Sequence, residues 1–100
     1  MRLWVDDCRI PPTEGEWIWL KTVNGTIDFL NRFKGMNMIE LISLDHDAGD
    51  FAKDGGDYIR ILDWMEANNY DNIIIHIHSR NPVGVANMNR ICEKNGWIVI

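Results

Sequence analysis

The sequence predicts one α/β domain built on a mostly parallel sheet of five strands. Short apolar runs alternate along the chain with segments whose apolar residues recur at helical spacing, which is the pattern of strands joined by helices. Of the 100 residues 46% are hydrophobic, and five are tryptophan, so the chain can form one core without disulfides. It contains no internal repeat, low-complexity tract or linker. We therefore expect a single domain over residues 1–100.

The first part of the chain contains two predicted strands with a loop between them. RLWV at 2–5 ends at an acidic pair, and RIPPTEGE at 9–16 is a loop because of its prolines and glycine. WIWL at 17–20 is the second strand. Thr22 then suits the N-cap of a helix that Gly35 closes. The apolar positions of this helix are Val23, Ile27 and Leu30.

The middle of the chain contains a third strand and a second helix. IELISL at 39–44 is the strand, and it runs directly into DHDAGD. FAKDGGD at 51–57 is a glycine-rich loop that leads into the helix. The apolar face of this helix follows the i, i+3, i+4, i+7 pattern and consists of Tyr58, Ile61, Leu62 and Met65.

The last part of the chain contains two strands that flank a third helix. IIIHIH at 73–78 is predicted as a buried strand, although two histidines interrupt its isoleucines. Asn81 suits an N-cap and Pro82 the first helical position, so a helix begins there and ends near Gly96. WIVI at 97–100 is the fifth strand.

Strands separated by helices imply right-handed crossovers and a mostly parallel sheet. The first connection is different, because a Pro-rich loop lies where a helix is expected. We therefore predict a flavodoxin-like or receiver-like three-layer fold with its first helix replaced by this loop.

Charge and cysteine content restrict the function. The net charge of −5 and the pI near 5.0 argue against a long nucleic-acid-binding surface, but a small anion or an RNA end could bind through local cations or a metal. Cys8 and Cys92 are too few for a disulfide framework or a four-cysteine zinc site. There is no apolar signal core, and no apolar run approaches the ~20 residues that span a bilayer. We expect a cytoplasmic protein without a membrane partner.

Most of the residues that could carry chemistry follow the predicted strands at their carboxyl ends. Ligands bind at this rim of parallel sheets, near the point where the strand order reverses. The three groups are Asp6 and Asp7 after the first strand, Asp45, His46 and Asp47 after the third, and His76, His78, Ser79 and Asn81 at the end of the fourth. We expect these three groups of side chains to lie close together at this rim of the sheet.

The two histidines are predicted to share one face of their strand. The period of two places His76 and His78 about 6.5–7 Å apart. Imidazoles supply metal ligands or an acid and a base near pH 7, while paired carboxylates suit a divalent ion. The helix that begins at Pro82 would direct free N–H groups at an anion. These imidazole, carboxylate and N–H groups together suit a site that binds a metal ion and a phosphate.

Structural interpretations of the same residues stay open. The two histidines could be core residues with satisfied hydrogen bonds, and Asp6 and Asp7 could be turn formers. Ser79 is equally suited to a turn hydroxyl and Asn81 to a helix cap.

The chain resembles the receiver domains of two-component signalling, and more closely a divergent group of cyclic-phosphate processing receiver-like domains. The motifs that carry this resemblance are LWVDDCRIPP, WIWLKT, LISLDHDAGD and HIHSRNPVG, in this order and over nearly the whole chain. The resemblance implies a receiver-type fold that acts as an enzyme on cyclic phosphates. The residues that it places around the site are Asp6, Asp7, Asp45, Asp47, His76, His78 and Ser79.

The resulting hypothesis is a metal-assisted phosphoesterase that opens a cyclic phosphate, either the 2′,3′-cyclic end of an RNA or a cyclic nucleotide signal. The metal, Mg²⁺ or Mn²⁺ first and Zn²⁺ second, would be held by Asp6, Asp7 and Asp45. The expected catalytic residues are His76 and His78 as ligands or as base and acid, Asp47 as the group that orients one of them, and Ser79. The expected phosphate-binding residues are Arg9, Lys21, Arg80 and Asn81.

Two alternatives accompany this hypothesis. Asp45 could act as a nucleophile that forms an aspartyl-phosphate, as receivers do. The protein could also be a non-catalytic degenerate receiver that binds a metal, a cyclic nucleotide or a partner protein.

Overall fold

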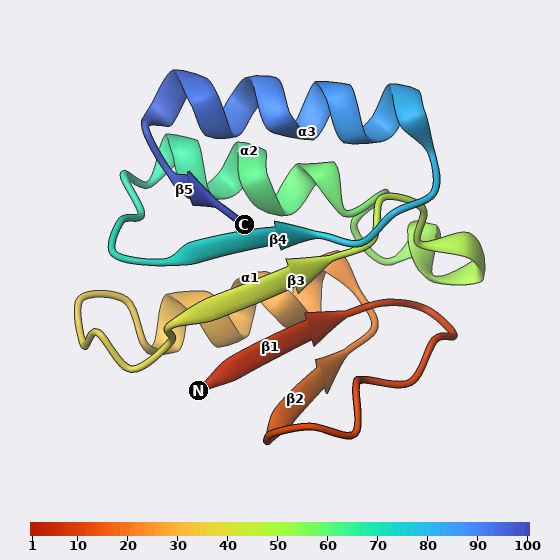
Figure 1. The fold of residues 1–100 in the computed structure, drawn as a ribbon, viewed down its shortest axis with the longest axis horizontal. Coiled ribbons are helices and arrows are strands. Elements are labelled where there is room, and N and C mark those ends of the chain that lie inside the picture. Colours follow the sequence, from red (N-terminus) through yellow and green to blue (C-terminus); the bar gives the residue numbers. More distant parts are fainter.

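A computed structural model describes all residues from 1 to 100 and shows a five-stranded, entirely parallel sheet with three α-helices (Figure 1). The strand order is β2-β1-β3-β4-β5. The elements are β1 (Arg2–Val5), β2 (Trp17–Leu20), α1 (Val23–Arg32), β3 (Leu41–Leu44), α2 (Ile59–Ala67), β4 (Ile74–Ile77), α3 (Pro82–Asn95) and β5 (Ile98–Val99). This arrangement confirms the receiver-like α/β fold that the sequence predicts.

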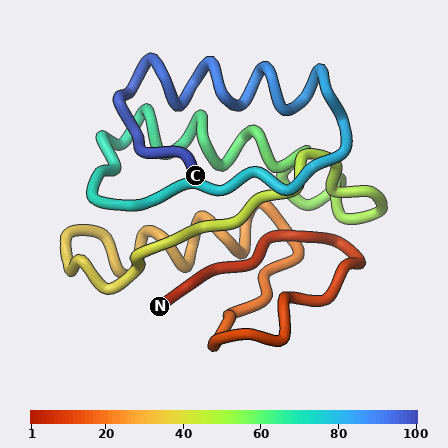
Figure 2. Tube along the Cα trace, viewed as in Figure 1, coloured from red at the N-terminus to blue at the C-terminus, as the bar shows by residue number.

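The three helices form one layer on one face of the sheet, so the predicted third layer is not present. From β2 onward the chain always moves in the same direction across the sheet, and right-handed crossovers of this kind all pass over the same face. The trace in Figure 2 follows this path, and α2 packs between α1 and α3. Only the connection from β1 to β2 runs in the opposite direction, and there the loop of residues 6–16 replaces the first helix, as predicted.

The core lies between the sheet and the helix layer. Alternate strand residues such as Leu3, Val5 and Ile42 are fully buried, as the period of two requires. They pack against the buried faces of the helices, which include Leu30, Ile61, Leu62, Met65 and Met88. Each fully buried side chain of this size stabilises the fold by about 1.5–3 kcal/mol.

The predicted caps position the helices. The Thr22 hydroxyl accepts a hydrogen bond from the backbone N–H of Gly25 at 2.9 Å, and Asn81 Oδ1 accepts one from Gly84 at 3.0 Å. Gly96 ends α3 in the left-handed region with φ of +67°. Gly35 does not cap α1, which ends at Arg32 with Phe33 as its cap, because the left-handed Gly35 lies in the following turn.

Some local features differ from the expectations. Part of the glycine-rich loop forms a 3₁₀ turn at Gly49–Lys53. Three strands are shorter than predicted, because β3 begins at Leu41 rather than at residue 39, β4 covers Ile74–Ile77 rather than 73–78, and β5 covers Ile98–Val99 rather than 97–100. None of the helices is long and apolar enough to cross a membrane.

Candidate functional site

A row of side chains crosses the sheet on the face opposite the helices. The strand register aligns Trp19 of β2, Trp4 of β1, Ser43 of β3 and His76 of β4. Ser43 is fully buried, and its Oγ lies 2.8 Å from Nδ1 of His76. Ser43 is not among the predicted site residues. The available signal was a hydroxyl in the middle of an apolar strand, on the face opposite that of Ile42 and Leu44.

Ser43 also contacts the second histidine, so one hydroxyl joins both rings. Its Oγ lies 2.8 Å from Nδ1 of His78 as well. The ring centroids of His76 and His78 are 6.4 Å apart, which agrees with the predicted placement on one face.

Asp6 anchors the other side of His78. Its Oδ2 lies 2.9 Å from Nε2 of His78, while Oδ1 accepts hydrogen bonds from the backbone N–H groups of Cys8 and Arg9 at 3.0 and 2.9 Å. Asp6 is fully buried, and burial by itself raises the pKa of its carboxyl. The three hydrogen bonds outweigh burial and lower this pKa, so Asp6 is a carboxylate at neutral pH.

His78 is a neutral imidazole held between aromatic and polar neighbours. Its ring stacks on Trp4 with 3.9 Å between centroids and an angle of 2° between the planes. Burial lowers the pKa of His78, and the hydrogen bond to Asp6 opposes this effect only in part. A continuous chain of hydrogen-bonding groups therefore runs from Asp6 through His78 and Ser43 to His76.

Arg9 is the cation that the fold places beside these hydrogen-bonded side chains. Its Nη1 donates to the backbone oxygen of His78 at 3.2 Å. Its guanidinium also lies 3.8 Å from an oxygen of Asp6 and 3.9 Å from one of Asp45. The Arg9 side chain is 42% exposed, so these ion pairs contribute little to stability, and the guanidinium remains accessible to an anion.

The side chains of the other predicted phosphate-binding residues form no hydrogen bond or ion pair with Asp6, His78, Ser43 or His76. Lys21 is exposed, with its Nζ 4.6 Å from the centroid of Trp19. Arg80 is exposed and forms no ion pair. The side chain of Asn81 caps α3, and the hydroxyl of Ser79 accepts a hydrogen bond from the Asn81 backbone at 3.1 Å. Ser79 and Asn81 thus form the turn into α3, and their part in binding or catalysis stays a prediction.

Asp47 contacts a different histidine from the expected one. Its Oδ1 lies 2.9 Å from Nδ1 of His46, so the prediction that Asp47 orients His76 or His78 is wrong. Its other oxygen, Oδ2, accepts a hydrogen bond from Nδ2 of Asn81 at 3.5 Å, so both oxygens of Asp47 are engaged by His46 and Asn81. The His46 ring packs against the first turn of α3, where a Cβ atom on Gly84 would lie only 2.5 Å from its Cγ.

The acidic residues gather near the same rim. Asp45 is almost fully buried, and its Oδ1 accepts a hydrogen bond from the backbone of His46 at 2.8 Å. Burial raises the pKa of Tyr58, and the nearby carboxylates of Asp7, Asp6 and Asp45 raise it further. The three predicted metal ligands are therefore close enough to the Tyr58 hydroxyl to act on it electrostatically.

Two groups of side chains could hold a metal ion. In each group one ligand atom per residue lies within 4.8 Å of the others; the groups are Asp6, Asp7 and Cys8, and His46, Asp47 and Asp57. The carboxylates of the first group suit a hard divalent ion, and Asp7 is more accessible than the fully buried Asp6. Desolvation and the Asp7 carboxylate raise the pKa of the Cys8 thiol, which makes Cys8 the weakest ligand of the three. Asp45 belongs to neither group.

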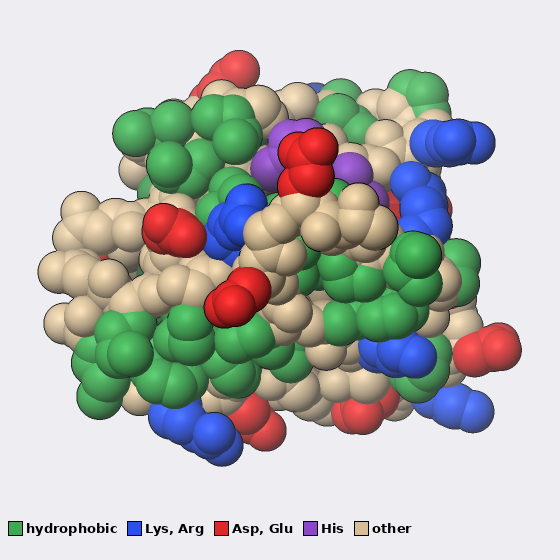
Figure 3. Space-filling view, turned by 60° about the horizontal axis from the view of Figure 1, so that its bottom comes forward, with side chains coloured by type: hydrophobic (Ala, Val, Ile, Leu, Met, Phe, Trp, Pro, Cys, Tyr) green, Lys and Arg blue, Asp and Glu red, His purple; other side chains and the backbone are tan.

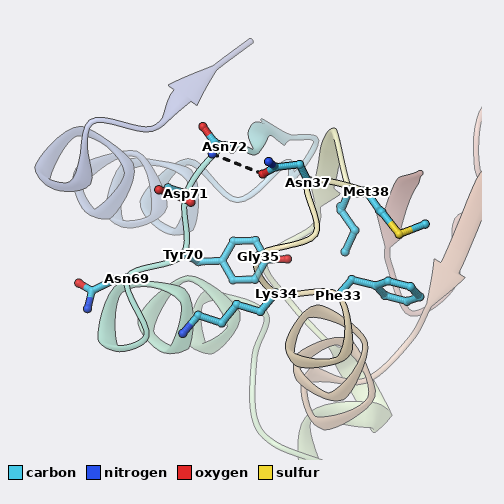
Figure 4. Close-up of a pocket in the computed structure, with 10 residues that line it drawn as sticks. Phe33, Lys34, Gly35, Asn37, Met38, Asn69, Tyr70, Asp71 and Asn72 are labelled. Atoms are coloured by element: carbon cyan, nitrogen blue, oxygen red, sulfur yellow. Dashed lines mark hydrogen bonds between the residues drawn. The ribbon is translucent and has the colours of Figure 1, made fainter.

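Histidine side chains reach the surface in one patch beside acidic and basic side chains (Figure 3). By contrast, a pocket of about 100 Å³ lies at the opposite rim, before the amino ends of β3 and β4 (Figure 4). Asn72 donates a hydrogen bond to Asn37 across it at 3.4 Å, and its other lining residues include Phe33, Met38 and Tyr70. This pocket contains none of the predicted site residues.

Comparison with known proteins gives one match. A family model described as the cyclic-phosphate processing receiver domain matches residues 1–94. No curated protein and no solved structure matches the chain. The matched region includes the hydrogen-bonded residues Asp6, His78, Ser43 and His76 and all the predicted site residues. This protein therefore belongs to the cyclic-phosphate processing receiver domain family.

Proposed function

We propose that this domain is a phosphoesterase that opens a cyclic phosphate by hydrolysis. The observation that carries the proposal is the chain Asp6–His78–Ser43–His76, with Arg9 beside it at the carboxyl ends of the strands. A buried carboxylate connected to an accessible imidazole is an arrangement that serves proton transfer. Membership of a cyclic-phosphate processing family supports a phosphate as the substrate.

His76 is the proposed general base. It is half-buried, and its Nε2 has no hydrogen-bond partner in the protein, whereas both ring nitrogens of His78 are engaged. His76 would remove a proton from a water molecule as its oxygen bonds to phosphorus. One P–O bond of the ring then breaks, and the proton is returned to the leaving oxygen or to solvent. The product is a phosphomonoester with a free hydroxyl.

Arg9 is the proposed electrostatic partner of the phosphate. Its guanidinium is partly exposed and presents paired N–H groups that match two phosphate oxygens. It would neutralise charge that develops on the phosphate during attack. Lys21, Arg80 and Asn81 remain further candidates for phosphate binding, and Ser79 remains a candidate catalytic hydroxyl.

A divalent ion, Mg²⁺ or Mn²⁺ before Zn²⁺, is the proposed cofactor, with Asp6, Asp7 and Asp45 as its ligands. Since the oxygens of Asp6 already accept three hydrogen bonds, Asp7 would be its principal ligand. Such an ion supplies positive charge for the phosphate oxygens when bound.

The proposed substrate is a small nucleotide or the 2′,3′-cyclic end of an RNA, in the cytoplasm. The net charge of −5 disfavours binding along a nucleic acid, while a terminal phosphate needs only the local groups.

The test is turnover of nucleoside 2′,3′-cyclic monophosphates and of 3′,5′-linked cyclic mono- and dinucleotides, followed by chromatography, with Mg²⁺, Mn²⁺ or Zn²⁺. His76→Gln should abolish ring opening, and Lys94→Gln, at the exposed far end of α3, should not change it. Stabilisation against heat by a cyclic nucleotide without turnover would instead favour a non-catalytic receiver module.

A further inference from the structure

The buried hydroxyl of Ser43 has one proton and two imidazole neighbours. Its Oγ lies 2.8 Å from Nδ1 of both His76 and His78. A hydroxyl donates one hydrogen bond and accepts others, so it can donate to only one of these nitrogens. The other nitrogen must carry its own proton. The two histidines are therefore not equivalent, although they lie on the same strand face.

Asp6 determines which atoms donate and which accept in the hydrogen bonds that join Asp6, His78, Ser43 and His76. A carboxylate only accepts hydrogen bonds, so Nε2 of His78, 2.9 Å from Asp6 Oδ2, carries a proton. In the neutral ring the proton on Nε2 leaves a lone pair on Nδ1. The hydroxyl of Ser43 is the donor within reach of that lone pair. Ser43 consequently accepts a hydrogen bond from His76, whose proton lies on Nδ1.

We propose that Ser43 is a positioning residue, which holds His76 as the Nδ1–H tautomer and leaves the lone pair of Nε2 free to accept a proton. A free imidazole in water favours the opposite tautomer, with the proton on Nε2, so without this contact the exposed nitrogen of His76 would mostly be protonated. The use of this lone pair in ring opening rests on the proposed function. The tautomer itself does not.

The first test measures the tautomers without any substrate. In protein labelled with ¹⁵N at histidine, long-range ¹H–¹⁵N correlation spectra at neutral pH should show His76 protonated at Nδ1 and His78 protonated at Nε2. In Ser43→Ala, His76 should shift towards the Nε2–H form while His78 keeps its proton on Nε2. An Nε2–H form of His76 in the wild type, or no change in Ser43→Ala, would overturn the proposal.

Two further variants separate this effect from a general loss of packing. Ser43→Thr keeps the hydroxyl and suits a strand, so it should keep the wild-type tautomer of His76. Thr26→Val removes another fully buried hydroxyl, on α1, and should leave both histidine tautomers unchanged. Loss of the Nδ1–H form in Ser43→Thr or in Thr26→Val would contradict a specific role for the Ser43 hydroxyl.

The second test uses the enzyme assay. If cyclic phosphates are opened, Ser43→Ala should lower kcat by about tenfold or more with a much smaller change in KM, since a general base contributes about 10²–10⁴-fold. Ser43→Thr should restore much of the rate. Expected tautomers without turnover would refute the proposed function alone, and turnover with the reversed tautomer would refute only the role of Ser43.

Discussion

The ring of His78 lies flat on the indole of Trp4, 3.9 Å away between centroids and nearly parallel to it. The indole also donates a hydrogen bond from Nε1 to the backbone oxygen of Arg9 at 2.8 Å. Trp4 thus excludes water from one side of His78 and fixes the start of the loop that carries Arg9. Its position couples the stability of β1 to the geometry of the site.

Replacement of Trp4 should affect both stability and His78. Trp4→Ala removes a nearly fully buried indole and should lower the free energy of unfolding by about 3–5 kcal/mol. Trp4→Phe keeps a ring but loses the N–H, and should cost about 1 kcal/mol for that hydrogen bond. Urea denaturation gives both values. Trp4→Phe keeps an aromatic ring against His78 and with it the burial that lowers the pKa of this histidine. The pKa should therefore remain lowered, and a return to about 6.5 in an NMR titration would contradict this effect of burial.

Acid should destabilise the protein from slightly acidic pH downward. The folded state lowers the pKa of His78 below its ordinary 6.5, so the unfolded chain binds more protons as the pH falls below that value. The contribution of neutral His78 is therefore complete above pH 6.5 and decreases as the pH falls towards its folded pKa. The lowered pKa of Asp6 adds a loss of the same sign below about 3.8.

Denaturant unfolding between pH 8 and pH 5 measures this dependence. The free energy of unfolding should decrease over the acidic part of this range, and the slope should be smaller in His78→Gln, which has no titrating ring. An equal slope in the variant would mean that other groups cause the acid sensitivity.

Gly84→Ala should destabilise the protein although alanine favours helices. A Cβ at this position would lie 2.5 Å from Cγ of His46, and overpacking of this kind costs about 1–3 kcal/mol. In the His46→Ala background the same change should be neutral or stabilising, because the ring is gone. A double-mutant cycle from thermal or urea unfolding measures the coupling, and additive effects would exclude the predicted clash.

Arg9→Gln should reduce catalysis much more than stability. A hydrogen bond to a charged group contributes about 1.5–3 kcal/mol, so kcat/KM for a cyclic phosphate should fall about tenfold or more. Arg9→Lys keeps the charge but not the paired N–H groups and should recover only part of the rate. The urea midpoint should change little in either variant, because the side chain is partly exposed and its ion pairs contribute little to stability. A large loss of stability would indicate a structural role instead.

A divalent ion should stabilise the protein through Asp7. At a concentration of about one hundred times its Kd, Mg²⁺ or Mn²⁺ should raise the free energy of unfolding by about 2.7 kcal/mol. Asp7→Asn should remove most of this effect, whereas Asp57→Asn should not if the ion binds near Asp6 rather than near His46. Thermal unfolding with and without the metal measures both, and loss of the effect only in Asp57→Asn would place the ion in the other group.

Much of the site could be predicted because its residues stand at strand ends that the apolar pattern defines. The chain brings Asp6, Asp45, His76 and His78 to one rim because the carboxyl ends of parallel strands meet there. The contacts of Asp47 with His46 and Asn81 depend on the loop after β3, whose conformation has no periodic signal in the sequence. The role of Ser43 could not be predicted, because a serine within a strand is common and only the register of β3 and β4 places its hydroxyl between two imidazoles.

Local sequence alone determined the elements, the N-caps Thr22 and Asn81 and the five parallel strands, because apolar spacing and cap residues act over a few neighbouring positions. The tertiary structure decided the rest. It placed all the helices on one face, because every crossover from β2 onward moves in the same direction across the sheet. It also set the register across β1, β3 and β4, and with it the hydrogen bonds from Asp6 to His76. Contacts between residues so distant in the chain depend on the packing of the whole sheet, which no short segment encodes.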